Sequence, residues 1–345
     1  MTTAVDVLKA LDVITGGRMI DSAEHVQNER DHPFVIMKSS GIYGKEVLEI
    51  PSLVYGPRDK EIKKIAVCMT MTELGIELAG ATDVDAIVAH HPVADAASCG
   101  GVTLKNYLDL YKIAVFECHE AFHGLHPGIA YLHGHQVYKS DIAYGGEHGN
   151  VMFVGRPIEG VNNMNDILGR LNDFMGLDKE EELLGSERSI KGSEEIIDVS
   201  LVTKGRIMAG DPNEKINGIL HIFPHTGFTA QQMRQAVAEN PEVDTVVASI
   251  SRVYEGHELI RQAKELGLKF LVGNSHVLEI LENGMPLARA LQRLLPNVEV
   301  VLFRERVTST PVRQVGNQKL QNYTEKFSEA HLLGKNQITL PTEFA

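Results

Sequence analysis

The chain has little cysteine, no excess of basic residues and no long apolar run, and each absence excludes a class of protein. Its three cysteines form no CxxC pair, and their number is too small and odd for a disulfide framework. With a net charge of −13, the chain lacks the clustered Lys and Arg that bind nucleic acid. It contains no run of about 18 apolar residues, so we expect no membrane-spanning helix.

These absences predict a protein of a reducing compartment, which we take to be the cytoplasm. The N-terminal segment carries Asp6, Lys9 and Asp12, so it is expected to form an amphipathic helix over 5–14 and not a signal peptide. The sequence also contains no GxGxxG and no GxSxG motif. A dinucleotide fingerprint and a serine nucleophile elbow are therefore unsupported.

From about residue 60, short apolar runs alternate with helical segments, and a second alternation begins near residue 195. Strands and helices in this order predict an α/β protein with parallel strands. We divide the chain into an α/β half over 1–150, a second α/β half over 151–313 and a polar tail over 314–345. The highly charged stretch 178–195 is expected to be an exposed loop.

Histidines gather where the predicted strands end. Eight of the 15 histidines fall between His90 and His148. His90 and His91 follow the run AIVA, His119 follows AVFEC, and His276 follows KFLVGNS. In open α/β sheets, ligands bind outside the carboxyl ends of the strands. The placement therefore predicts a ligand site at these ends.

Neutral imidazole is the commonest metal ligand in proteins, which makes this site a candidate metal centre. His119 and His123 have i,i+4 spacing, and His276 and Glu279 have i,i+3 spacing, so each pair shares one helix face. The predicted metal ligands are His90, His91, His123, His276 and Glu279. His119 or Glu120 would orient a ligand or accept a proton. The HGH segment at 133–135 has no other marker of a metal-binding strand and is interpreted as structural.

These segments resemble the Nif-three-like dinuclear metal-centre proteins, also described as GTP cyclohydrolase type two. The resemblance rests on IAVCMTMTELGIELAGATDVDAIVAHHP, CHEAFHGLHPGIAYLHG and FLVGNSHVLE, and it extends over most of the chain. It implies two α/β halves with mixed sheets flanked by helices, and a metal site between the halves. It also implies a homo-oligomer, often a hexamer.

Carried over residue by residue, the resemblance implies ligands at His90, His91, His276 and Glu279, and one or two Zn, Fe or Mn ions per chain. His123 and Thr70 stand where the family has aspartates. A carboxylate can bridge two metals through two oxygens, whereas a neutral imidazole offers one lone pair. We therefore expect His123 to bind one metal, with any second metal weakly held.

Two functions remain open from the sequence. The first is a metal-dependent hydrolase that activates water for attack on a small-molecule substrate. The alternative is a non-catalytic metal carrier or regulatory scaffold. The loss of acidic groups near the site favours this alternative, because general acid–base catalysis usually needs a spare carboxylate or histidine.

Overall fold

The computed structural model describes residues 1–28, 31–39, 46–91, 101–119, 121–122, 128–146, 150–249 and 253–333. The chain forms two compact units. The larger unit comprises Met1–Gly176 and Thr203–Glu305, and the smaller comprises Leu177–Val202 and Arg306–Ala345. Within the described ranges, no helix is both long enough and apolar enough to cross a bilayer.

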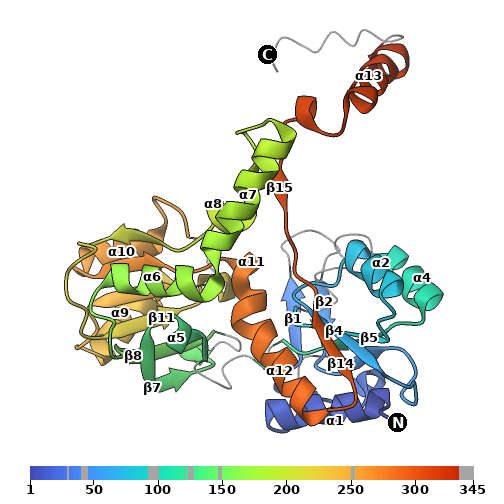
Figure 1. Cartoon of the computed structure of the whole chain (residues 1–345). Coiled ribbons are helices and arrows are strands. Elements are labelled where there is room, and N and C mark those ends of the chain that lie inside the picture. Colours follow the sequence, from blue (N-terminus) through green and yellow to red (C-terminus); the bar gives the residue numbers. More distant parts are fainter. Residues whose placement is uncertain are drawn as a thin grey trace. The chain divides into compact units, whose positions relative to one another are not determined.

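The first sheet of the larger unit has five strands in the order β14-β4-β5-β6-β3 (Figure 1). Four of them are parallel, and β3 runs antiparallel to β6. The strands are β3 (Leu53–Tyr55), β4 (Lys64–Cys68), β5 (Ala86–Ala89), β6 (Ala114–Glu117) and β14 (Glu299–Leu302). Because β5 and β6 are buried along their whole length, they appear in the sequence as continuous apolar runs.

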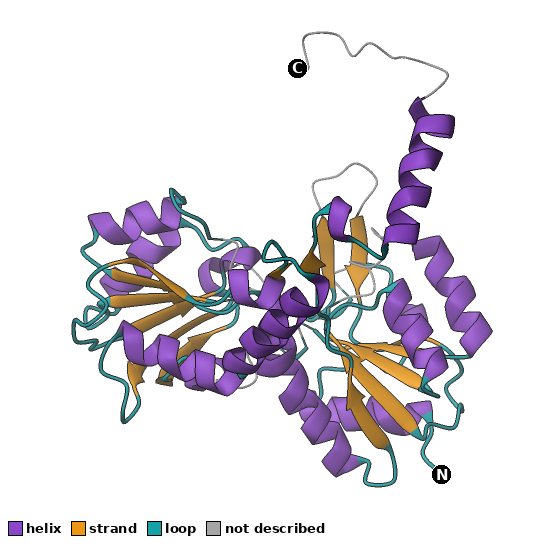
Figure 2. Cartoon of the chain, turned by 45° about the horizontal axis from the view of Figure 1, so that its top comes forward, coloured by secondary structure: helices purple, strands orange, loops and turns teal. Residues whose placement is uncertain are grey.

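Helices cover both faces of this sheet (Figure 2). One face packs against α1 (Ala4–Thr15) and α12 (Met285–Leu294), and the other against α2 (Glu73–Ala81) and α4 (Gly101–Tyr111). The helix predicted over 5–14 is present as α1. It begins with a capping box between Thr3 and Asp6, and it ends at Gly16, which takes the left-handed conformation.

The second sheet of the larger unit has six strands in the order β10-β13-β12-β11-β8-β7. The inner strands β11, β12 and β13 are parallel, while β7, β8 and β10 are antiparallel to their neighbours. The strands are β7 (His135–Asp141), β8 (Met152–Pro157), β10 (Arg206–Ala209), β11 (Ile219–Ile222), β12 (Thr245–Ala248) and β13 (Lys269–Val272). Both large sheets are therefore mixed, with parallel strands at their centres.

One face of the six-stranded sheet packs against α9 (Ala230–Glu239) and α10 (Glu258–Glu265). The opposite face packs against α6 (Met164–Met175) and, beside it, α5 (Gly128–Leu132). The predicted boundary at residue 150 falls between β7 and β8, which pair with each other in this sheet. The short 3₁₀ segments are η1 (Ala23–His25), η2 (Tyr144–Gly146), η3 (Pro224–Thr226) and η5 (Val312–Gln314).

Two smaller elements of the larger unit bear on the site. The hairpin of β1 (Ile36–Ser39) and β2 (Glu46–Glu49) is antiparallel. After β13, the chain enters α11 (His276–Glu279), continues through the π-helical segment η4 (Ile280–Gly284) and leads directly into α12. π-Helical segments are frequent at functional sites.

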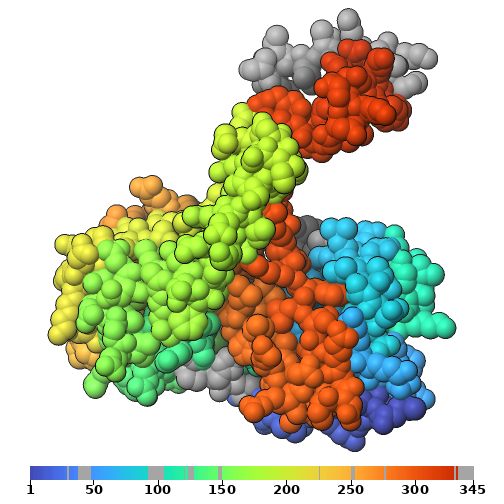
Figure 3. All heavy atoms as spheres, in the orientation of Figure 1, coloured from blue at the N-terminus to red at the C-terminus, as the bar shows by residue number. Residues whose placement is uncertain are grey.

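The smaller unit contains α7 (Leu177–Lys191), α8 (Val199–Val202), α13 (Gln318–Phe327), the π-helical η6 (Ser328–Leu333), and the paired strands β9 (Ile197–Asp198) and β15 (Thr308–Ser309). The prediction of a loop over 178–195 is wrong, because most of it is α7. Its Glu, Lys and Leu residues are good helix formers, and Lys191 pairs with Glu187 one turn away. The charge that suggested a loop belongs to a helix at the molecular surface (Figure 3).

Candidate metal centre

The carboxyl ends of β4, β5 and β6 carry the predicted histidines to one edge of the five-stranded sheet. These strands are parallel and in register, with Cys68 beside Ala89 and Ala89 beside Glu117. Backbone pairing continues beyond the strands, since the amide of His90 donates to the Cys68 carbonyl over 2.9 Å. The ring centroids of His90, His91 and His119 consequently lie 5.2–5.7 Å apart.

Both adjacent histidines reach the same carboxylate. Nε2 of His90 lies 3.2 Å from Oε1 of Glu279, and Nε2 of His91 lies 3.3 Å from Oε2. His90 and Glu279 are fully buried. Glu279 ends α11, and Asn283, one turn further on, donates to its Oε1 over 2.9 Å. The two histidines therefore turn toward one point instead of facing opposite sides of an extended chain.

The second ring nitrogen, Nδ1, of His90 and of His91 also has a hydrogen-bond partner. Nδ1 of His90 lies 3.2 Å from the Cys118 carbonyl oxygen, and Nδ1 of His91 lies 2.9 Å from Oγ1 of Thr70. A carbonyl can only accept, so Nδ1 of His90 carries the proton and Nε2 of the neutral ring is an acceptor. That acceptor faces a buried carboxylate oxygen, also an acceptor. Such a pair is stable only with a cation between its atoms, either a proton or a metal ion.

His119 makes the third contact of this kind, with a carboxylate that sequence reasoning missed. Its Nδ1 lies 3.1 Å from Oε1 and 3.2 Å from Oε2 of Glu49, which ends β2 and is fully buried. The ring stands edge-on to the rings of His90 and His91. A lone acidic residue in a short strand, 70 residues from its partner, is a signal too weak to identify from one sequence.

Burial controls the protonation of the groups around this edge. It raises the pKa of the Cys118 and Cys68 thiols to about 12, so neither supplies a thiolate ligand at neutral pH. Burial likewise raises the pKa of Glu305, and the nearby His91 opposes that shift. It raises the pKa of Glu282 on η4 to about 8, with the Glu279 charge adding to the effect.

Comparison with known proteins concerns one segment of the sequence and the fold. The family model of Duf34/NIF3 (NGG1p interacting factor 3) matches residues 51–97, which include β3, β4, β5 and the two adjacent histidines. A Bacillus cereus protein related to NIF3 has a TM-score of 0.55 at 10% identity, covering 90% of this chain and 99% of that one. Over this segment and in its fold, the chain is similar to the NIF3 family.

Two further solved structures share the fold of this chain. The protein ybgI, of unknown function, has a TM-score of 0.52 at 14% identity and covers 88% of this chain and 98% of its own. A hypothetical protein of Staphylococcus aureus has a TM-score of 0.51 at 14% identity, covering 87% of this chain and 96% of its own. At these identities the likeness concerns the fold alone. No curated protein matches the chain.

The structure describes some of the predicted ligands and not others. It brings His90, His91 and Glu279 together and places His119 beside them. His276 begins α11, but its side chain, like the whole of Glu120 and His123, lies outside the described residues. Among the described side chains alone, no group of three or more His, Cys, Asp or Glu residues is arranged to hold a metal ion.

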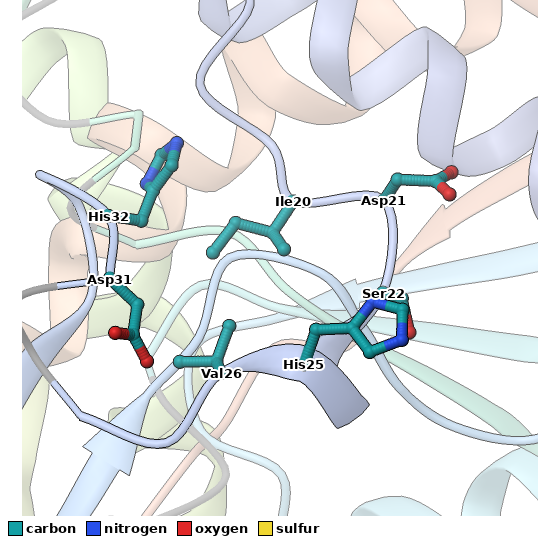
Figure 4. A pocket seen from close by; sticks show the side chains of 7 residues that line it. All are labelled: Ile20, Asp21, Ser22, His25, Val26, Asp31 and His32. Atoms are coloured by element: carbon teal, nitrogen blue, oxygen red, sulfur yellow. The ribbon is translucent and has the colours of Figure 1, made fainter.

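Other histidines of the chain lie away from that edge of the five-stranded sheet. A hollow of about 280 Å³ is lined by Ile20, Asp21, Ser22, His25, Val26, Asp31 and His32. Figure 4 shows His25 and His32 on opposite sides of it. Asp31 accepts from the Gln27 and Asn28 amides, and His32 accepts from the Phe34 amide. These local hydrogen bonds occupy Asp31 and His32.

Proposed function

We propose that this chain is a metal-dependent hydrolase that holds a divalent zinc, iron or manganese ion at the carboxyl edge of the five-stranded sheet. The observation that carries the proposal is the buried pair of acceptors, Nε2 of His90 and Oε1 of Glu279. Imidazole and carboxylate together suit these metals. His91 belongs to the same ligand set, and His123 and His276 are the remaining proposed ligands.

The residues around the proposed ion divide into ligands and a proton acceptor. A divalent cation held in such a site would make hydroxide accessible at neutral pH by lowering the pKa of its water to about 7. The Glu49 carboxylate accepts the Nδ1 proton of His119, so the neutral ring presents Nε2 as a base. Glu49 orients that ring and stabilises the imidazolium that forms when it takes up a proton. Glu120 remains the alternative proton acceptor.

Glu49 also bears on the alternative of a non-catalytic metal carrier. The carrier hypothesis was favoured by an apparent lack of acidic groups near the site. A buried carboxylate bonded to a histidine beside the ligands supplies such a group. The hydrolase is therefore the better-supported function, acting on a small molecule whose identity the chain does not reveal.

The metal is tested by elemental analysis of purified protein after supplementation with zinc, iron or manganese. We expect about one ion per chain, with a second ion only weakly held because His123 replaces a bridging carboxylate. His90→Ala should reduce the content below about 0.2 per chain. His25→Ala removes an exposed imidazole elsewhere and should leave it unchanged. A metal-free wild-type protein would contradict the proposal.

Hydrolysis is tested by presenting the metal-loaded protein with phosphoesters, nucleotides and amides. For any substrate found, Glu49→Gln should lower kcat by about 100-fold without changing metal content, since the orienting charge on His119 is lost. A protein that binds metal tightly but hydrolyses none of these substrates would favour the carrier.

We also propose that the chain forms a closed homo-oligomer, which the family resemblance suggests is a hexamer. Light scattering at micromolar concentration should give a multiple of the 38.0 kDa chain mass. A monomer would contradict the assembly and leave the metal proposal standing.

A further inference from the structure

Glu279 lies at the candidate centre and ends α11, which a connection of three residues, Gly273 to Ser275, joins to β13. We propose that His133 is a positioning residue that supports this connection through contact with Gly273, and so sets the place of α11 in the metal centre. The inference rests on the proposed metal function, but the contact itself can be tested without metal.

His133 follows α5 and is fully buried. Its Nδ1 lies 2.8 Å from the Ile129 carbonyl oxygen, which can only accept, so Nδ1 carries the proton. Its Nε2 has no hydrogen-bond partner among the described atoms. The ring is thus anchored at one nitrogen and presents the other to its neighbours.

Gly273 fills the space in front of that nitrogen. A Cβ at this position would lie 2.3 Å from Nε2 of His133 and 3.1 Å from Cβ of Ser249. The backbone of Gly273 does not take the left-handed conformation, so glycine is required by space and not by backbone geometry. The imidazole therefore leaves no room for a side chain at position 273.

The His133 ring has little freedom to move away. We define the imidazole cluster as His133, His135, His221 and Ser249. His221 stands edge-on to His133 at 4.8 Å between ring centroids, and its Nε2 bonds to Oγ of Ser249 at 2.6 Å. Nδ1 of His221 bonds to Nε2 of His135 at 3.0 Å. Since this chain of contacts is fully buried, a larger group at 273 would displace the backbone and not the ring.

Such a displacement would reach the centre because the residues after Gly273 are tied to α11 and η4. Nδ2 of Asn274 donates to Oε1 of Glu282 over 3.0 Å, and Asn283 donates to Glu279. Oγ of Ser275 bonds to Oγ1 of Thr203 at 2.7 Å. A shift at the start of this segment is therefore transmitted to the carboxylate that faces His90 and His91.

The imidazole cluster is not itself proposed as a second metal site. Its two unpartnered nitrogens, Nε2 of His133 and Nδ1 of His135, face the backbones of Gly273 and Gly155 respectively. They do not converge on one another. The cluster is therefore better suited to rigid packing than to ligation.

The test pairs Gly273→Ala with a variant that makes room for the new methyl group. Gly273→Ala should lower the zinc affinity, measured against a chromophoric chelator, by about 10- to 100-fold. Adding His133→Ala should recover part of that loss, because the new methyl group then occupies the space of the ring and takes over its contact with the connection. Gly169→Ala is the matched control, since a Cβ there meets nothing within 4 Å.

Hydrogen exchange of the peptide covering 273–284, measured without metal, gives a second readout. It should rise in Gly273→Ala and return toward wild type in the double variant. If wild-type protein binds no zinc, the proposed function fails, and the exchange result alone decides the positioning role. Unchanged exchange in Gly273→Ala, or no recovery in the double variant, would overturn it. If Gly273→Ala is too unstable to purify, recovery of folded protein by His133→Ala supports the contact, and failure to recover contradicts it.

Discussion

The two groups of buried histidines in the larger unit differ in their partners. At the edge of the five-stranded sheet, His90, His91 and His119 each face a carboxylate oxygen at 3.1–3.3 Å. In the imidazole cluster of the six-stranded sheet, the bonds run to another imidazole, a hydroxyl and a backbone carbonyl. The first group combines acceptors that need a cation, whereas the described contacts of the second group include no carboxylate.

The pKa values of the imidazole cluster show the effect of burial on these histidines. Burial lowers the pKa of His133 to about 4 and that of His135 to about 3, and it lowers the pKa of His221 well below 6.5. A neutral imidazole packs as a polar aromatic ring, whereas one paired with a carboxylate is a potential ligand or proton acceptor. Both groups are buried and rich in histidine. The carboxylate partners are therefore the feature that distinguishes the candidate site from the imidazole cluster.

The largest expected effect comes from removing the carboxylate shared by His90 and His91. Glu279→Gln keeps the shape of the side chain but loses its charge, so we expect zinc affinity to fall by more than about 100-fold. In the wild type, a chelator should lower the Tm by removing binding free energy, and in Glu279→Gln it should not. Equal affinity in the two proteins would remove the distinction between the two histidine groups.

A change in the imidazole cluster is expected to lower stability and to leave zinc affinity nearly unchanged. His135→Ala should lower the free energy of unfolding by about 2–4 kcal/mol, because it leaves a cavity and removes the partner of His221. Zinc affinity should change by less than about threefold. Urea denaturation of metal-free protein measures the free energy of unfolding, with His25→Ala as control. Loss of metal comparable to that in Glu279→Gln would show that the cluster also binds the ion.

The cluster should also make stability depend on pH. Between pH 6.5 and about 4, the unfolded chain binds protons at His133 and His135 that the folded chain does not. The free energy of unfolding is therefore highest above pH 6.5 and falls as the pH falls, by about 1.4 kcal/mol per unit for each histidine.

Denaturation of metal-free protein at pH 7, 6 and 5 measures this slope. The double variant His133→Ala with His135→Ala should have a shallower slope than the wild type, while His25→Ala should not differ from it. Identical slopes in all three proteins would show that these histidines are not the cause.

The smallest effect is expected from the hydroxyl that orients His91. Thr70→Val removes the bond to Nδ1 and keeps a similar shape, so zinc affinity should fall by about tenfold at most. Isothermal titration beside Glu279→Gln would rank the two changes. A larger loss in Thr70→Val than in Glu279→Gln would mean that the carboxylate is not the principal partner.

Particular residues show how far prediction from the sequence extended. The placement of His90 and His91 followed from the apolar run before them and from the parallel order of the strands, and both lie where predicted. Glu49 was missed because its contact with His119 depends on how the β1–β2 hairpin packs, not on any local pattern. The segment over α7 was misinterpreted because charge was given more weight than helix propensity.

The sequence by itself determined the short-range features of this protein. Apolar runs specified the inner strands, and capping residues such as Thr3 and Asp6 specified where helices begin, because these effects act between near neighbours. Only the tertiary structure decided which carboxylate meets which imidazole. Glu279 lies 189 residues from His90, and their approach depends on the packing of both large sheets and their helices. Imidazoles that pack beside other imidazoles instead form the neutral cluster around His133. Long-range packing therefore distinguishes the candidate metal centre from the imidazole cluster.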